Sequence, residues 1–314
     1  MLEINNLTKN YGRHTVVDDL SFRCGSGEVL GFLGPNGAGK STTMKMVTGF
    51  VAPSAGTAAV CGHDIQADTL AAQRRIGYLP EGAPLYAEMT PAGFLNFIAD
   101  IRGLRGSNRQ ARLDEVIERL HLGPVLDQTI DTLSKGFKRR VGLAQAILHD
   151  PDVLILDEPT DGLDPNQKHE VRELIRSMSE EKLIVISTHI LEEVEAVCTR
   201  AIIIAAGKIL ADDSPENLAA SSRYHNAVRL HISNDANFDE VRAAIEGLPS
   251  VAKTESDREH LRITAIASNV NRDVAAWRDV SDLVAERGLK VDGIQLETGR
   301  LDEVFRQITQ GAET

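Results

Sequence analysis

Residues 34–42 constrain the fold of this chain more than any other segment. They read GPNGAGKST and directly follow the apolar run at 29–33, which is the strand-to-helix setting that the pattern G-x-x-x-x-G-K-[ST] requires. Glycines in such a turn let backbone N–H groups converge on phosphate oxygens, while the lysine neutralises phosphate charge and the hydroxyl ligates Mg²⁺. The segment predicts a nucleotide site in which Lys40 holds the β- and γ-phosphates and Ser41 holds the metal.

The rest of the N-terminal two thirds fits an α/β sheet around this loop. Short apolar strands alternate with helical patterns up to about residue 210, and that alternation is typical of α/β folds. Further strands are predicted at 153–156, 184–186 and 201–205. Residues 90–122 are predicted to be helical, because Thr90 and Pro91 form a cap and a first-turn proline. Four apolar residues that share one helix face are interpreted as core: Leu113, Val116, Ile117 and Leu120.

Polar side chains follow two of the predicted strands. VLILDE ends in Asp157 and Glu158, and IVISTH ends in His189. Open α/β sheets bind ligands at the carboxyl ends of their strands, so we expect Asp157 to reach the metal through water and Glu158 to orient and deprotonate an attacking water. His189 is expected to contact the γ-phosphate. A solvated acid pair and a structural histidine are the alternatives, which the preceding phosphate loop disfavours.

A change of pattern after about residue 220 indicates a second domain. From residue 226 onward we predict a strand at 226–233, a helix at 238–248, strands at 251–256 and 260–267, a helix at 271–288 and a strand at 291–297, followed by a final helix at 301–309. This β-α-β-β-α-β order favours a small α+β domain of the ferredoxin-like type. We find no ligand constellation in it, and Trp277 is interpreted as core.

Charge and apolar patterning limit the partners. The net charge of −12 argues against wrapping of nucleic acid by a basic surface. Cys24, Cys61 and Cys198 lack the paired spacing of a disulfide framework or zinc site. The apolar runs are far shorter than the ~20 residues needed to cross a bilayer, and the first residues lack the layout of a signal peptide. We therefore expect a cytoplasmic protein that reaches the membrane only through a partner.

Five segments in order resemble the ATP-binding subunits of ABC transporters, over most of residues 2–218. GPNGAGKST resembles the Walker A loop, LSKG the signature motif, VLILDE the Walker B strand, DGLD the D-loop and STH the switch histidine. The resemblance implies a P-loop NTPase of ABC type at 1–220, with a RecA-like core and a helical subdomain at about 85–150. Residues 221–314 would then form the accessory domain.

The resemblance also implies site residues and a dimer. Tyr11 would stack on adenine. Two chains would pair head to tail, so that Ser134 and Gly136 of one chain meet the γ-phosphate of ATP held by the other, next to Asp164 of the D-loop. The nucleotide, bound with Mg²⁺, would lie on the Walker A residues: Gly34, Pro35, Asn36, Gly37, Ala38, Gly39, Lys40, Ser41 and Thr42.

Two departures from the family pattern stand out. Lys135 and Phe137 occupy the third and fifth positions of the signature motif, as in the LSKG variant of one branch of exporters. Glu81 replaces the Q-loop glutamine and would join the metal site. An added carboxylate near Asp157 and Glu158 should increase repulsion in the metal-free site and make closure more dependent on Mg²⁺. Lys138, Arg139 and Arg140 after the motif are interpreted as a solvated helix face.

The resemblance implies an ATPase that energises a separate transmembrane permease, with no nucleic-acid partner. The branch resembles drug, polysaccharide and gliding-motility-associated exporters, of which the gliding-associated group is the most similar. The alternative is an ABC-type ATPase that acts on nucleic acid or ribosomes. The single GKST and the absence of a heptad run between the Walker motifs disfavour it. For the C-terminal domain, a dimer-stabilising role is preferred to a regulatory or small-ligand role.

Overall fold

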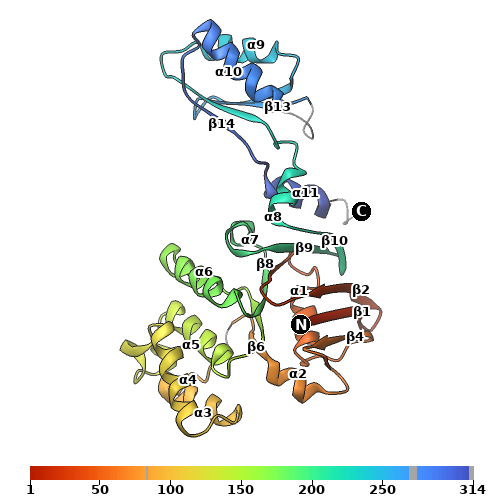
Figure 1. The fold of residues 1–314 in the computed structure, drawn as a ribbon, viewed down its shortest axis with the longest axis vertical. Coiled ribbons are helices and arrows are strands. Elements are labelled where there is room, and N and C mark those ends of the chain that lie inside the picture. The colour runs from red at the N-terminus through yellow and green to blue at the C-terminus, as the bar shows by residue number, and fades with distance from the viewer. Residues whose placement is uncertain (83, 269–273, 311–314) are drawn as a thin grey trace. The chain divides into compact units, whose positions relative to one another are not determined.

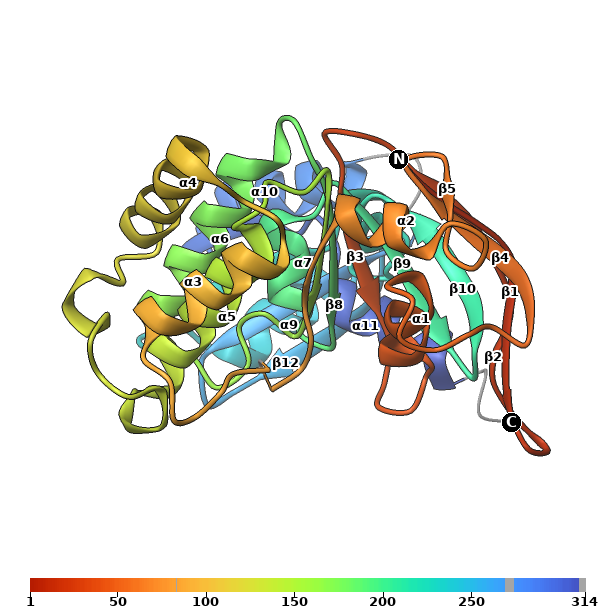
Figure 2. The same ribbon diagram turned by 90° about the horizontal axis from the view of Figure 1, so that it is seen from below.

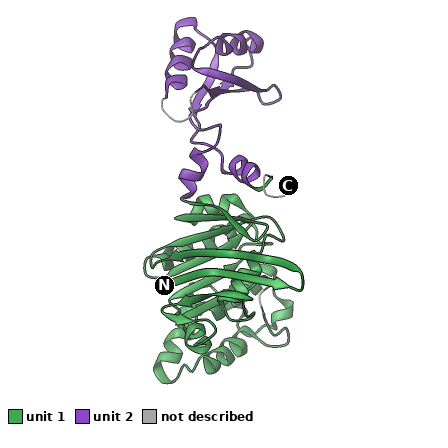
Figure 3. Ribbon diagram, turned by 90° about the vertical axis from the view of Figure 1, so that its right-hand side faces the viewer, with its two compact units in different colours: residues 1–213, 309–314 green, residues 214–308 purple. Residues whose placement is uncertain are grey.

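The chain divides into two units (Figure 3). The computed structural model describes residues 1–82, 84–268 and 274–310. Unit 1 contains residues 1–213 and 309–314, and unit 2 contains residues 214–308. Each unit has its own hydrophobic core.

The central sheet of unit 1 has six strands in the order β10-β9-β3-β8-β7-β6. They are β3 (Val29–Leu33), β6 (Ile76–Leu79), β7 (Val153–Asp157), β8 (Leu183–Thr188), β9 (Arg200–Ala205) and β10 (Lys208–Asp213). All neighbours pair in parallel except β9 and β10. Every residue of β3, β7 and β8 is buried, as their unbroken apolar sequences predict for strands covered on both faces. Their carboxyl ends therefore meet at one edge.

A second sheet of unit 1 is antiparallel, in the order β2-β1-β4-β5. Its strands are β1 (Leu2–Tyr11), β2 (His14–Cys24), β4 (Ala55–Val60) and β5 (His63–Asp64). Side chains from this sheet share one core with the central sheet and with α1 (Lys40–Val47). Phe22 and Phe32, one from each sheet, have ring centroids 5.8 Å apart. The sequence prediction did not include this sheet.

Helices pack around the central sheet of unit 1. They are α2 (Thr69–Arg75), α3 (Pro91–Ile101), α4 (Gly106–Arg119), α5 (Lys135–Ile147), α6 (Pro165–Ser179) and α7 (Leu191–Val197), with short 3₁₀ turns at Gly123–Val125 and Ile130–Thr132. Figure 2 shows α3 to α6 on one side of β8, and β1, β2 and β4 on the other. The Thr90 side chain accepts from the Gly93 N–H, and Pro91 is the first residue of α3, so the predicted helix start is confirmed. No helix in the described ranges combines the length and apolar character needed to span a bilayer.

Unit 2 contains a four-stranded antiparallel sheet in the order β12-β13-β11-β14. Its elements are α8 (Pro215–Ala220), β11 (Val228–Ile232), α9 (Phe238–Glu246), β12 (Val251–Asp257), β13 (Arg262–Ala267), α10 (Ala275–Arg287), β14 (Val291–Leu296) and most of α11 (Leu301–Gln310). Figure 1 shows α9 and α10 beside the strands β13 and β14. Val228, Leu230 and Ile263 pack with α9 and α10, and Trp277 is partly buried against this core. The helix predicted at 271–288 begins on residues 271–273, which lie outside the described residues.

Candidate functional site

The phosphate loop needs glycine at two close approaches. Gly39 has φ 103°, and a Cβ atom there would lie 2.6 Å from the Val16 carbonyl oxygen. A Cβ atom on Gly34 would lie 2.4 Å from the Ile204 carbonyl oxygen. Larger residues would force the loop away from its neighbours, so these glycines let the backbone wrap tightly between β3 and α1.

Lys40 is held by the loop from which it projects. Its side chain is buried, and Nζ donates to the carbonyl oxygens of Gly34 at 2.6 Å and Pro35 at 3.1 Å. Burial lowers the pKa of Lys40, and the carboxylates of Glu158, Asp157 and Glu81 oppose that shift. These negative groups favour the ammonium form, which is the form that binds phosphate oxygens.

Glu158 and His189 meet at the ends of two neighbouring strands. His189 Nδ1 lies 2.9 Å from Glu158 Oε1, and the Glu158 side chain is 15% exposed while that of His189 is 48% exposed. Glu158 has a left-handed backbone (φ 51°), and its N–H donates to the Ser187 carbonyl oxygen at 2.8 Å. A carboxylate that is mostly shielded and paired with an imidazole can accept a proton from a nearby water.

One cavity of about 470 Å³ brings the predicted catalytic residues together. Its lining consists of the phosphate loop and the strand ends: Val16, Asn36, Gly37, Gly39, Lys40, Ser41, Thr42, Glu81, Glu158, Asp161 and His189. Glu81, which follows β6, therefore lies at the same sheet edge as Glu158. Val16 was not predicted as a site residue, because a lone valine in a strand carries no sequence signal for ligand binding.

The donor set suits Mg²⁺ with a nucleotide. Asp157 Oδ1, Thr160 Oγ1 and Ser187 Oγ are buried without a hydrogen-bond partner, so this sheet edge has unused oxygen acceptors. No group of three or more His, Cys, Asp or Glu side chains among the described residues could hold a metal alone. Mg²⁺ prefers octahedral oxygen ligands, and proteins usually supply one or two carboxylates while phosphates and waters supply the rest. Asp157 and the Ser41 hydroxyl fit that division.

Eight predicted residues do not line this cavity: Gly34, Pro35, Ala38, Asp157, Tyr11, Ser134, Gly136 and Asp164. Tyr11 ends β1 with 52% of its surface exposed, and Lys9 Nζ lies 5.0 Å from its ring centroid. Ser134 caps α5 by accepting from the Phe137 N–H at 3.3 Å, and Asp164 caps α6 by accepting from the Gln167 N–H at 2.9 Å. Gly136 lies in the first turn of α5. The roles expected for Ser134 and Gly136 involve a second chain, and they stay predictions.

The cationic run after the signature segment is not a solvated helix face. Arg139 is buried, with 7% of its surface exposed, and donates to main-chain carbonyl oxygens. Lys138 and Arg140 are half-buried: Lys138 Nζ donates to the Asp131 carbonyl oxygen at 2.8 Å, and Arg140 pairs with Glu170. The prediction was wrong because α5 packs against β6, so the helix has no fully exposed face at these positions.

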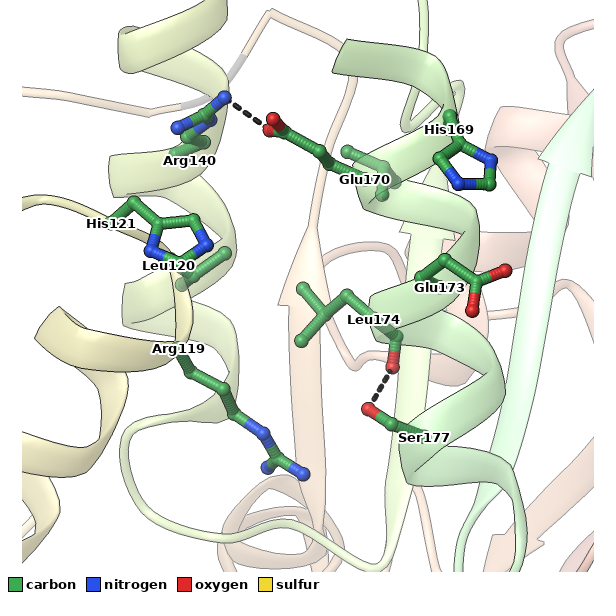
Figure 4. A pocket seen from close by; sticks show the side chains of 10 residues that line it. Arg119, Leu120, His121, Arg140, His169, Glu170, Glu173, Leu174 and Ser177 are labelled. Atoms are coloured by element: carbon green, nitrogen blue, oxygen red, sulfur yellow. Dashed lines mark hydrogen bonds and ion pairs between the residues drawn. The ribbon is translucent and has the colours of Figure 1, made fainter. Parts of the chain in front are cut away.

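A second cavity, of about 320 Å³, lies between α5 and α6 (Figure 4). Arg140 from α5 and Glu170 from α6 point toward each other, and His121 and Leu174 lie below them. None of the residues predicted for nucleotide binding lines this cavity. The chemistry predicted from the sequence therefore belongs to the cavity at the phosphate loop.

Comparisons with known proteins agree with this geometry. The family model described as ABC transporter matches residues 17–161. The chain is 38% identical to the Nod factor export ATP-binding protein I of Paraburkholderia xenovorans over 83% of this chain and 84% of that protein. It is 33% identical to the linearmycin resistance ATP-binding protein LnrL of Bacillus subtilis over 98% of each. A solved structure of the ATP binding subunit of an ABC transporter is 31% identical and covers 69% of this chain and 91% of its own, with a TM-score of 0.65.

Proposed function

This chain belongs to the ABC transporter family as one of its ATP-binding proteins, and we propose that it drives export through a separate membrane permease. It is an ATPase that uses Mg²⁺. His189 Nδ1 lies 2.9 Å from Glu158 Oε1, and both residues line one cavity with Lys40 and Ser41. This arrangement is the observation on which we assign residues to the steps of ATP hydrolysis.

The predicted catalytic and metal-binding residues would have distinct tasks in hydrolysis. Lys40 would exchange its bonds to loop carbonyls for bonds to the β- and γ-phosphates. Glu158 would accept a proton from the water that attacks the γ-phosphorus, and His189 would hold that carboxylate and the γ-phosphate in line. Ser41 and Asp157 would hold Mg²⁺, with Glu81 nearby, and the metal supplies charge neutralisation on the phosphates.

The signature segment would complete the site of a second copy. Ser134 and Gly136 lie at the N-terminus of α5, a helix of 13 residues. The backbone N–H groups and dipole at such a terminus favour an anion such as the γ-phosphate. The two copies would close head to tail on ATP and separate after hydrolysis, with Asp164 next to the interface and Tyr11 stacked on adenine.

A groove in unit 1 is an argument for the proposed permease partner. It has a volume of about 730 Å³ and is lined by residues of α2, β6, α3 and α5 together with Phe50. Its rim exposes large apolar side chains: Phe50 is 71% exposed, Leu70 72% and Ile101 63%. Exposed apolar surface of this kind marks interaction sites. Ile98 and Ile101 of the groove belong to the segment at 90–122. We propose that this segment and the surface near Glu81 transmit dimer closure to the permease, at the cytoplasmic face of the membrane.

The direction of transport is inferred from the relatives. One is named for Nod factor export, and another for linearmycin resistance. We therefore propose export. The cargo would be recognised by the permease and not by this chain.

Replacement of Glu158 by Gln tests the proposal. The purified variant should bind MgATP with wild-type affinity and hydrolyse it on the order of 10²- to 10³-fold more slowly, because the amide cannot take the proton. Trapped with MgATP, it should be recovered from detergent-solubilised membranes of its own cells with a multi-span protein in stoichiometric amount. Recovery with ribosomes or nucleic acid, and no membrane protein, would support the alternative function.

We propose that the domain predicted at 221–314, most of which belongs to unit 2, is an accessory domain that stabilises the dimer. A chain ending at residue 220 should still hydrolyse ATP but should dimerise more weakly. Sedimentation of the truncated and full-length chains, both carrying Glu158→Gln, at several protein concentrations would measure the dimer. Unchanged dimerisation and rate would exclude the stabilising role.

A further inference from the structure

The guanidinium group of Arg139 binds the chain segment that carries Glu158. Its Nε donates to the Pro159 carbonyl oxygen at 2.9 Å, and its Nη2 donates to that of Asp157 at 2.7 Å and to that of Glu158. Its Nη1 lies 3.4 Å from the carbonyl oxygen of Pro80, the residue before Glu81. A planar guanidinium has five donors in a fixed fork, so one buried side chain joins the ends of β7 and β6.

Glu158 needs such support because its backbone is in an uncommon conformation. Its φ of 51° lies in the left-handed region, which is unfavourable for a residue with a side chain and is found where surrounding contacts impose it. The peptide is held on both sides: its N–H donates to Ser187 and its carbonyl oxygen accepts from Arg139. Without the guanidinium, the carbonyl side is free to rotate, and the carboxylate would leave its position beside His189.

Helix α5, which carries Arg139, is attached to the edge of the central sheet. β6 is the last strand of the six-stranded sheet, and carbonyl groups of β6 and of Pro80, the residue after it, face side chains in and just after α5. The carbonyl groups of Pro80, Tyr78 and Ile76 face Arg139 at 3.4 Å, Gln145 at 2.7 Å and His149 at 3.0 Å. Side chains in and just after α5 thus take the place of a neighbouring strand. α5 is therefore held to β6 and to the end of β7 as one body.

The N-terminus of this body is the signature segment. Ser134 caps α5 five positions before Arg139, so a shift of Ser134 is carried along the helix to the carbonyl oxygens beside Glu158. We propose that Arg139 is a positioning residue for Glu158 and that it couples the signature segment to the catalytic carboxylate of the same chain. This coupling rests on the proposed dimer. When Ser134 of one chain contacts ATP held by the partner, α5 of that chain positions Glu158 of the same chain at the second ATP site. Hydrolysis at the two sites is therefore cooperative.

Three variants test the proposal. Arg139→Met keeps the aliphatic stem and removes every donor. Arg139→Lys keeps a charge but loses the planar fork. Lys138→Met is the matched control, because Lys138 is the cation next to Arg139 and donates to the Asp131 carbonyl oxygen, not to the end of β7. For each chain we would measure kcat, KM and the Hill coefficient for ATP hydrolysis, the Kd for a fluorescent ATP analogue, and the melting temperature.

Arg139→Met should lower kcat on the order of 100-fold, the loss typical of a displacement of about 1 Å at a catalytic group. Its Hill coefficient should fall to one while Kd stays within about twofold of wild type. Arg139→Lys should be intermediate and Lys138→Met unchanged. If Arg139→Met does not fold, the loss of kcat at constant Kd in Arg139→Lys decides the question.

Other outcomes overturn the proposal. Wild-type kcat and cooperativity in Arg139→Met or Arg139→Lys would remove the positioning role, as would an equal loss in Lys138→Met. A wild-type chain that hydrolyses ATP without cooperativity would exclude the coupling. By contrast, a wild-type chain that does not hydrolyse ATP, or a fully active Glu158→Gln variant, would contradict the proposed function itself.

Discussion

The central sheet of unit 1 and the sheet of unit 2 differ in how certain polar side chains in and beside them are paired. At the edge of the central sheet in unit 1, Asp157 Oδ1, Thr160 Oγ1 and Ser187 Oγ are buried without hydrogen-bond partners. In the sheet of unit 2, Arg229 alternates with core residues and its Nη2 lies 2.6 Å from Glu297 Oε1, while Arg300 donates to both oxygens of Glu297 at 2.9 Å. Buried polar groups in folded proteins are normally paired. The contrast teaches that the edge in unit 1 keeps oxygen atoms available for the ligand that we propose there, whereas Arg229, Arg300 and Glu297 of unit 2 pair with one another.

The largest expected effect comes from comparing the same replacement in the two units. Lys40→Met should lower kcat/KM for ATP about 10²- to 10³-fold, because in the proposed mechanism Lys40 is the cation that stabilises charge on the transferring phosphate. Arg229→Met, the same replacement in unit 2, should change kcat/KM by less than about twofold. Steady-state phosphate release measures both. A comparable loss in the two variants would show that unit 2 takes part in hydrolysis.

The second effect concerns a buried histidine in unit 1. His149 Nε2 lies 3.0 Å from the Ile76 carbonyl oxygen and Nδ1 has no partner, and burial lowers the pKa of His149 to about 4 from its usual 6.5. Between these values the unfolded chain binds a proton that the folded chain does not, so the free energy of unfolding should fall as pH decreases from 6.5 to 4. His149→Gln should remove up to about 3 kcal/mol of that pH dependence.

Urea unfolding followed by far-ultraviolet circular dichroism at pH 7 and pH 4.5 would measure it. The same slope in the wild type and in His149→Gln would show that the ring is protonated in the folded chain.

The third effect is confined to unit 2. Glu297→Gln leaves Arg229 and Arg300 without their shared carboxylate, whose side chain is only 6% exposed, and should destabilise unit 2 by about 1–3 kcal/mol. Trp277 is the single tryptophan of the chain and lies in unit 2, so its fluorescence follows the unfolding of that unit. The rate of ATP hydrolysis should not change. A slower rate with an unmoved fluorescence transition would contradict a purely structural role.

The smallest effect tests the replacement of the Q-loop glutamine. Glu81 lines the cavity with Glu158, and like charges near one another favour a bound cation. Glu81→Gln should therefore lower the dependence of hydrolysis on Mg²⁺, with a change of a few-fold in the half-saturating concentration. An identical Mg²⁺ titration for the two chains would remove Glu81 from the metal site.

Local patterns predicted the catalytic end of the molecule well. The strand at 29–33, the helix start at Thr90 and Pro91, and the strands that end at Asp157 and before His189 are all present in the structure. These features depend on residues that are adjacent in sequence, and a parallel sheet brings the carboxyl ends of its strands to one edge whatever the loops between them do. The antiparallel sheet of unit 1 was missed, because its pairing of β1 with β4 joins strands on either side of the phosphate loop.

The amino-acid sequence by itself determined the chemistry: a phosphate loop, a lysine, paired acids and a histidine, each specified by a short motif that dictates its own backbone. Only the tertiary structure decided which other residues support that chemistry. Arg139 looked like one cation of a solvated run, yet its partners include Pro80, 59 positions away, and its neighbours Gln145 and His149 bind residues 67 and 73 positions away. Such contacts form when a helix packs against a distant strand, and the burial of unpaired carbonyl groups, which no local pattern encodes, determines which side chains must satisfy them.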